Sequence, residues 1–121
     1  MLAFGLAAPF LGVLVAMLRR VQASGIALAV PIPADVPAGL SVLDAAIVYR
    51  GADGAIHAYS NRCTHLGCRI DRIVGDEAVC PCHGSRYRAD GTVTAGPATR
   101  PLKRLRIEPD PESGGWIARA I

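Results

Sequence analysis

The chain has 121 residues, of which 51% are hydrophobic, with 13 Lys and Arg against 10 Asp and Glu. This length excludes a multidomain enzyme and leaves room for one small domain with an appendage. The formal charge of +3 is too mild to indicate nucleic-acid binding, so we expect no nucleic-acid partner.

The first 18 residues carry no charged side chain, and residues 2–18 form a continuous apolar run. As a helix this run would span about 26 Å, the lower limit for crossing a bilayer. A cleaved signal peptide needs basic residues ahead of its apolar run, and an amphipathic core helix needs a polar face. Since the run has neither, we expect residues 1–18 to form one transmembrane anchor and residues 19–25 a linker.

From residue 26 onward the sequence predicts short strands separated by turns, with no convincing helical period. The expected strands cover residues 26–32, 45–49, 55–60, 77–79, 92–94, 102–107 and 116–120. The second and third of these flank a glycine-containing loop and predict a hairpin. Residues 26–121 therefore predict an all-β domain, a small antiparallel sandwich or barrel.

All four cysteines and two of the three histidines lie in two motifs, CTHLGC at residues 63–68 and CPCHGS at residues 80–85. This spacing suits two hairpin tips that meet across a metal centre. A tetrahedral zinc site would use two Cys and two His, leaving Cys68 and Cys82 without a role. Two disulfides would leave both histidines unexplained. An iron–sulfur centre with mixed ligands has a use for all six residues.

The two motifs resemble the signature of the Rieske 2Fe-2S proteins. More narrowly, they resemble the Rieske subunits of cytochrome bc- and bf-type quinol-oxidising complexes. The resemblance covers about residues 57–101 and implies a Rieske-type β fold with a cluster-binding subdomain over about residues 61–101. The cofactor it implies is one 2Fe-2S cluster, and the metal ligands it implies are Cys63, His65, Cys80 and His83. It also implies a disulfide between Cys68 and Cys82 that holds the two loops together.

The resemblance assigns five further residues to the surroundings of the cluster. Ser85 and Tyr87 occupy positions that donate hydrogen bonds to a bridging sulfide and to a ligand sulfur. Such bonds raise the reduction potential, because they stabilise the reduced form. Leu66 follows a ligand and should shield the cluster from water. Gly96 and Pro97 match a proline-containing loop that covers the third side of the cluster.

Arginines surround the motifs. Arg100 follows the proline loop, where the family continues with more apolar residues. The others are Arg62, Arg69, Arg72, Arg86 and Arg88. We expect them to form a solvated basic collar, with docking on an acidic redox partner as the alternative.

The resemblance implies a redox subunit that is not a complete enzyme. It would accept an electron and a proton from quinol and pass the electron to a c-type cytochrome. His65 and His83 would be the catalytic groups, because each leaves one ring nitrogen free to take a proton. The expected partners are cytochrome b-like and cytochrome c-like subunits of a membrane complex, with quinol at a shared site. A relay subunit of another membrane or periplasmic oxidoreductase, similar to arsenite oxidase and without quinol contact, is the alternative, and a structural zinc module is the non-redox alternative.

Two features conflict over the side of the membrane. Arg19 and Arg20 follow the apolar run and favour a cytoplasmic position for the rest of the chain. The implied disulfide requires an oxidising compartment. Because the cysteine pattern is the more specific signal, we expect a single-pass protein of the cytoplasmic (inner) membrane, with its Rieske domain on the periplasmic or other oxidising side.

Overall fold

The computed structural model describes residues 12–15 and 29–121. Residues 12–15 are helical, and the remainder of the described chain consists of strands and loops. The strands are β1 (Ala29–Ile32), β2 (Gly39–Leu43), β3 (Ala46–Arg50), β4 (Ile56–Ser60), β5 (Arg72–Val74), β6 (Glu77–Val79), β7 (Arg86–Tyr87), β8 (Val93–Ala95), β9 (Arg106–Pro109) and β10 (Trp116–Arg119). The prediction of an all-β domain is confirmed.

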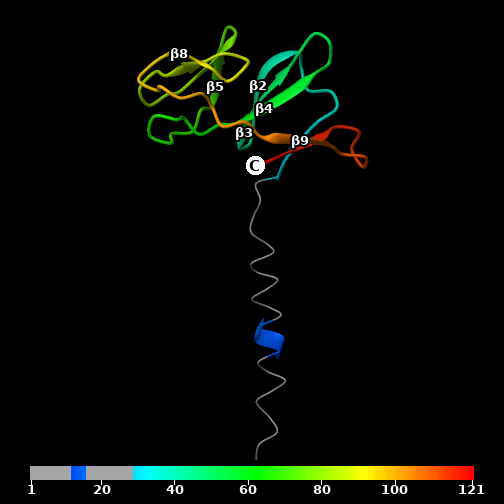
Figure 1. The fold of residues 1–121 in the computed structure, drawn as a ribbon. Helices are drawn as coiled ribbons and strands as arrows, with labels where there is room; N and C mark the ends of the chain where they lie inside the picture. Colours follow the sequence, from blue (N-terminus) through cyan, green and yellow to red (C-terminus); the bar gives the residue numbers. More distant parts are fainter. Residues whose placement is uncertain (1–11, 16–28) are drawn as a thin grey trace, which may run out of the picture.

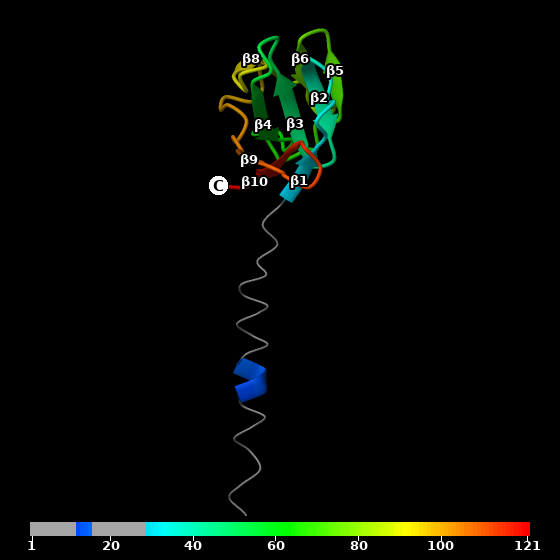
Figure 2. The same cartoon turned by 90° about the vertical axis from the view of Figure 1, so that its right-hand side faces the viewer.

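These strands form three antiparallel sheets (Figures 1 and 2). Their orders are β1-β10-β9, β2-β3-β4 and β5-β6-β7-β8. The predicted hairpin is formed by β3 and β4, with Tyr49 opposite His57. In Figure 1 the β5–β8 sheet occupies one side of the domain and the β2-β3-β4 sheet the other. Both predicted motifs lie at the first of these sheets, because one precedes β5 and the other joins β6 to β7.

The β2-β3-β4 sheet divides the interior into two hydrophobic cores. Successive side chains on a strand point to opposite faces, so one strand can serve both cores. Ile47 of β3 and Tyr59 of β4 pack into the core that also contains the two free cysteines. Their neighbours Val48 and Ala58 pack into the other core, which β1 and β10 complete. The same hairpin therefore supports both the candidate site and the remaining β domain.

Some predicted boundaries are wrong. The sequence did not predict β2, β5 or β7, and the last two have only three and two residues, too few for alternation to reveal them. The strand predicted over residues 102–107 begins at Arg106 instead. The preceding residues connect to different partners, since the amide of Leu102 donates to Gly91 and that of Leu105 donates to Ala58.

The predicted anchor over residues 1–18 and linker over residues 19–25 lie outside the described residues, apart from residues 12–15. Within the part of the chain that is described, no helix combines the length and the apolar character needed to cross a bilayer.

Candidate metal centre

The first motif forms a tight loop between β4 and β5. The amide of Cys63 donates to the carbonyl of Cys68 at 2.8 Å, and the amide of Gly67 donates to the carbonyl of Cys63 at 2.9 Å. Gly67 has a φ of 79°, a left-handed conformation that glycine adopts without a steric cost. The loop therefore begins and ends at a cysteine, with His65 in the turn.

The second motif repeats this construction between β6 and β7. The amide of Cys80 donates to the carbonyl of Ser85 at 2.8 Å, and the amide of Gly84 donates to the carbonyl of Cys80 at 3.1 Å. Gly84 has a φ of 81°. His83 again lies in the turn. Because the two loops share one backbone pattern, each leads from a cysteine in the core to a histidine nearer the surface.

A disulfide joins the two loops. It links Cys68 to Cys82, whose Cα atoms are 6.5 Å apart, so the predicted bridge is confirmed. Cys63 and Cys80 are free and buried, which excludes the alternative of two disulfides. The sulfur atoms of Cys68, Cys80 and Cys82 lie within 4.8 Å of one another, but two of them belong to the disulfide and offer no thiolate. The thiols that remain for a metal are those of Cys63 and Cys80.

The base of the site, where the two free cysteines lie, is buried, and its tip, where the two histidines lie, is open to solvent. Cys63 and Cys80 are 4% and 2% exposed, whereas His65 is half-buried and His83 is exposed. The two imidazole rings lie 5.1 Å apart between centroids, edge to face. Leu66, in the first turn, is 71% exposed. Sulfur donors thus lie inside and nitrogen donors outside, an arrangement that fits a binuclear centre with different ligands on its two metal ions.

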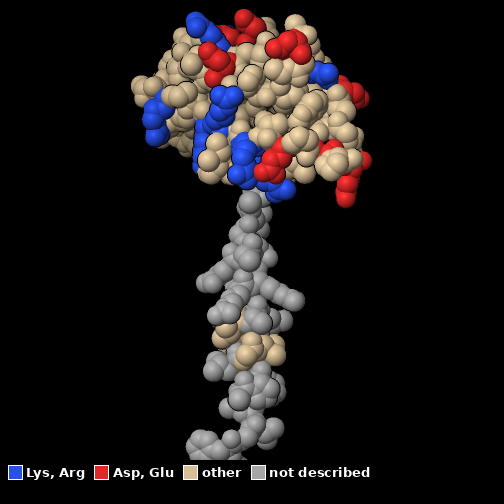
Figure 3. Space-filling view, turned by 45° about the vertical axis from the view of Figure 1, so that its right-hand side comes forward, with Lys and Arg blue, Asp and Glu red and all other residues tan. Residues whose placement is uncertain are grey.

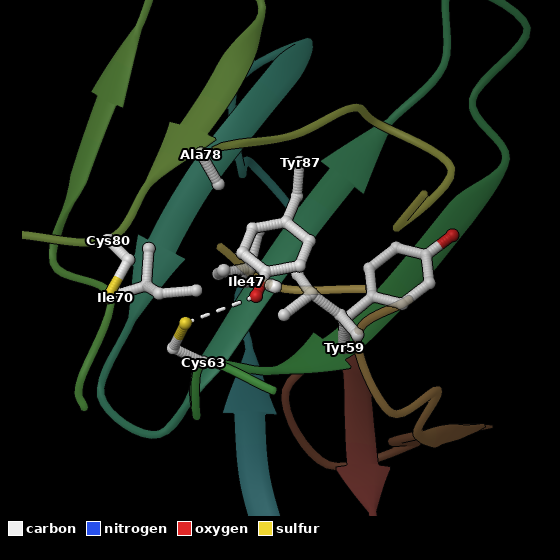
Figure 4. Close-up of a cluster of buried hydrophobic side chains, with 9 residues drawn as sticks. Ile47, Tyr59, Cys63, Ile70, Ala78, Cys80 and Tyr87 are labelled. Carbon is white, nitrogen blue, oxygen red and sulfur yellow. Dashed lines mark hydrogen bonds between the residues drawn. The ribbon is translucent and has the colours of Figure 1, made fainter. Parts of the chain in front are cut away.

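Tyr87 connects the first loop to the core (Figure 4). Its side chain is fully buried near Ile47, and its hydroxyl oxygen lies 3.2 Å from Sγ of Cys63. The amide of Thr64 donates to the same oxygen at 3.1 Å. Since a thiolate can only accept, the Tyr87 hydroxyl is placed to donate its proton to a deprotonated Cys63.

The two free thiols differ in acidity. Burial is the largest influence on Cys63 and raises its pKa, but hydrogen bonds outweigh burial and leave this pKa below its usual value. In order of effect, the groups that lower it are the Tyr87 side chain, the His65 backbone, and the Cys80 and Ser85 side chains. Burial also raises the pKa of Cys80, which stays above its usual value because the neighbouring Cys63 adds to the increase. Backbone hydrogen bonds from Cys82 and His83 lower the pKa of Cys80 without outweighing these effects, so Cys63 is the more acidic of the two thiols.

Ser85 ties the proline loop to the second motif. It is 1% exposed, and its Oγ accepts a hydrogen bond from the amide of Ala98 at 3.0 Å. Because the oxygen is the acceptor there, the hydroxyl proton remains available to a sulfur atom in the site. The Gly96–Pro97 peptide bond is cis, and both residues are exposed. The predicted proline loop thus lies at the site, where the buried Ser85 side chain holds it through the amide of Ala98.

Two residues outside the predicted cofactor site, Thr64 and Arg100, make further contacts here. Oγ1 of Thr64 lies 3.1 Å from the Tyr87 hydroxyl and donates to the carbonyl of Arg100 at 2.7 Å. Nη2 of Arg100 donates in return to the carbonyl of Thr64 at 3.3 Å. The position of Thr64 between two predicted ligands could have marked it as part of the site. No sequence pattern, however, pairs it with a residue 36 positions away.

Other arginines around the motifs also make contacts within the domain. Arg86 forms an ion pair with Glu77 at 3.1 Å, and Arg69 donates to the carbonyl of Asp44 at 2.7 Å. Figure 3 shows basic side chains mainly on the left and lower middle of the visible face, and acidic side chains mainly along its upper and right edges. Part of the predicted basic collar therefore stabilises the fold.

The third histidine of the chain has a different setting. Nδ1 of His57 lies 2.9 Å from Nη2 of Arg104. Both residues line a cavity of about 550 Å³ together with Tyr49 and Tyr59, and this cavity shares no residue with the predicted metal site. His57 is therefore a natural control for the two histidines of the motifs.

The donor set fits a 2Fe-2S cluster with mixed ligands, because two free thiols face inward, two imidazoles face outward and hydroxyl donors lie at the sulfur end. Residues 26–106 match the family model for the Rieske [2Fe-2S] domain. The chain belongs to this family, and its cofactor is a 2Fe-2S cluster.

The chain is similar to iron–sulfur subunits of cytochrome b6-f complexes. It is 53% identical over 49 residues to subunit 2 from Nostoc, a match that covers 40% of this chain and 28% of that protein. It is 36% identical over 86 residues to the subunit from Chlorobaculum tepidum, covering 67% of this chain and 48% of that one. The chain thus spans less than half the length of these relatives.

Among solved structures, the fold is similar to that of the cyanobacterial plasma membrane Rieske protein PetC3 from Synechocystis. The TM-score is 0.54 at 32% identity, and the match covers 62% of this chain and 76% of that one. This likeness confirms a Rieske fold for the described β domain.

Proposed function

We propose that this chain is an electron-transfer subunit whose cluster is held by Cys63 and Cys80 at the inner iron and by His65 and His83 at the outer iron. One observation carries the proposal: two free, buried cysteines are paired with two outward histidines on loops joined by a disulfide. When bound, the cluster supplies a one-electron centre that is uncharged when oxidised, which favours a reduction potential of about −150 to +300 mV.

Hydrogen-bond donors at the base of the site favour the upper part of this range. The Tyr87 hydroxyl is placed to donate to the sulfur of Cys63, and the Ser85 hydroxyl proton is available to a sulfur in the site. The reduced state carries one more negative charge than the oxidised state. Donors aimed at sulfur therefore stabilise the reduced state and raise the potential.

The histidines supply the proton acceptors. Each imidazole binds iron through one ring nitrogen and leaves the other nitrogen free. His83 is exposed and His65 is half-buried, so at least one free nitrogen is open to an incoming molecule. A quinol hydroxyl could donate a hydrogen bond, and then its proton, to that nitrogen, and the cluster held by the four proposed ligands would supply the one-electron acceptor.

The proposed setting is a membrane redox complex with cytochrome b-like and cytochrome c-like subunits. The similar proteins from Nostoc and Chlorobaculum are subunits of cytochrome b6-f complexes, and PetC3 is a plasma membrane protein. The Cys68–Cys82 disulfide persists in an oxidising compartment, which supports a position of the domain on the periplasmic or equivalent side of the membrane. Partner subunits would supply the quinol pocket.

Low-temperature EPR of the reduced protein in its membrane fraction tests the cluster and its ligands. A Rieske centre should give a signal whose average g value lies below that of all-cysteine clusters. His83→Gln and His65→Gln should abolish this signal, whereas the control His57→Gln should retain it. A signal that survives replacement of either motif histidine would contradict the ligand assignment.

Quinol contact is tested in the same membranes. A quinol-site inhibitor should shift the EPR signal, and the reduction potential should fall with rising pH if the centre takes up a proton together with its electron. A potential that stays constant from about pH 6 to about pH 10 would contradict the proton role. A signal that the inhibitor leaves unchanged would instead favour an electron relay without quinol.

A further inference from the structure

Arg100 is the cationic side chain that contacts the first cluster loop from the proline loop. Its Nη2 donates to the carbonyl of Thr64 at 3.3 Å, and that carbonyl belongs to the peptide bond that joins Thr64 to His65. Thr64 is also the residue directly after Cys63. The guanidinium group therefore lies one residue away from a proposed ligand of each iron.

None of the ion pairs among the described residues involves Arg100. Its positive charge is therefore not cancelled by a carboxylate contact within this part of the chain. A fixed positive charge lowers the energy of a nearby centre that gains negative charge, and the exposure of Arg100 weakens this effect without removing it.

We propose that Arg100 raises the reduction potential of the cluster through its positive charge. This proposal rests on the function proposed above. The reduced state carries one more negative charge than the oxidised state, so the guanidinium stabilises the reduced state more. The same charge also sets the dependence of the potential on ionic strength.

The charge of Arg100 can be removed without removing the contact between its backbone and Thr64. Thr64 donates its hydroxyl proton to the carbonyl of Arg100, a group that every residue at position 100 retains. Substitution of the Arg100 side chain therefore leaves the shorter of the two contacts between the loops in place. The side-chain contact and its charge are lost.

The experiment is a redox titration of the EPR signal in the full chain, comparing wild type with Arg100→Gln and Arg100→Lys. Arg100→Gln should have a lower midpoint potential, and Arg100→Lys should retain most of the wild-type value because it keeps the charge. The difference between wild type and Arg100→Gln should shrink between about 0.01 M and about 1 M salt, as the screening length falls from about 30 Å to about 3 Å.

Arg106→Gln is the matched control. It removes the same charge from β9, in the sheet that carries none of the proposed ligands, and should leave the potential unchanged. Equal potentials for Arg100→Gln and wild type would overturn the proposal, as would an equal fall in Arg106→Gln or a fall that Lys does not reverse. A wild-type protein without a Rieske signal would overturn the proposed function, which separates that failure from failure of the role of Arg100.

Discussion

The hydroxyl oxygen of Tyr87 lies 3.2 Å from Sγ of Cys63, although the two residues are 24 positions apart. Figure 4 shows the Tyr87 ring inside the core and its hydroxyl directed at the sulfur. The same oxygen accepts the Thr64 amide, which leaves its single proton for a donor role. The Thr64 hydroxyl donates its own proton to the carbonyl of Arg100, so its oxygen can accept one. Sγ of Cys63 and Oγ1 of Thr64 therefore compete for the Tyr87 proton. A thiolate is the stronger acceptor because it carries charge.

Tyr87→Phe should therefore lower the reduction potential. Removal of one donor to a charged sulfur should cost the reduced state about 1 kcal/mol relative to the oxidised state, or about 40 mV for one electron. The ring remains, so the core should stay packed. Redox titration of the EPR signal measures the shift. Tyr49→Phe is the control, because Tyr49 stacks on His57 away from the site. An unchanged potential in Tyr87→Phe would show that the hydroxyl does not donate to the cluster ligand.

The sequence predicts the residues that carry the chemistry of the site better than the contacts that hold those residues in place. Alternation and a glycine-containing loop suffice for the β3–β4 hairpin, because both signals are local. The cysteine and histidine spacing, with the family resemblance, predicts the disulfide that the structure contains. Contacts that depend on folding could not be predicted in this way. The contact between Thr64 and Arg100 forms only when the first motif loop and the proline loop come together, and β7 is too short to show a pattern.

The segment that leads into β9 illustrates the same limit. The alternating residues 102–107 suggest one strand, but only the end of this segment joins a sheet. Leu105 donates to Ala58 of β4, and Arg104 forms an isolated bridge with Tyr59. An extended segment can pair with several partners in succession. Its apolar residues then alternate just as they would in a strand that belongs to one sheet.

Loss of the disulfide should destabilise the domain. Cys68 and Cys82 are separated by 14 positions, and a loop of this length corresponds to about 3 kcal/mol in the chain-entropy description. The double variant Cys68→Ala with Cys82→Ala should unfold at lower denaturant concentration and lose its cluster faster. Visible absorbance of the cluster follows both changes. Reductant should destabilise the wild type and have no effect on the double variant, and equal sensitivity of both would contradict this account.

Ser85→Ala should loosen the proline loop. Ser85 Oγ is the acceptor for the Ala98 amide, and both residues are buried, so the variant leaves an amide without a partner at a cost of about 1–3 kcal/mol. Hydrogen exchange of the Ala98 amide should become faster, and the potential should fall if the hydroxyl proton reaches a sulfur. Ser60→Ala is the control, since Ser60 accepts the Arg62 amide at an exposed position. Equal destabilisation by the two substitutions would contradict the role of the buried contact.

Alkaline pH should destabilise the fold through Tyr59. Burial is the main cause that raises the pKa of this phenol above 10.0; Arg104 opposes the increase and Asp90 adds to it. The unfolded chain ionises at the ordinary pKa, whereas the folded chain holds the neutral phenol to higher pH. The contribution is therefore fully present below pH 10.0 and is lost as pH rises through the pKa of the folded state. Denaturant unfolding from about pH 9 to about pH 11 should show a smaller loss of stability in Tyr59→Phe than in wild type. An equal loss in both proteins would place the alkaline sensitivity at other groups, such as the buried Tyr87, whose pKa burial also raises.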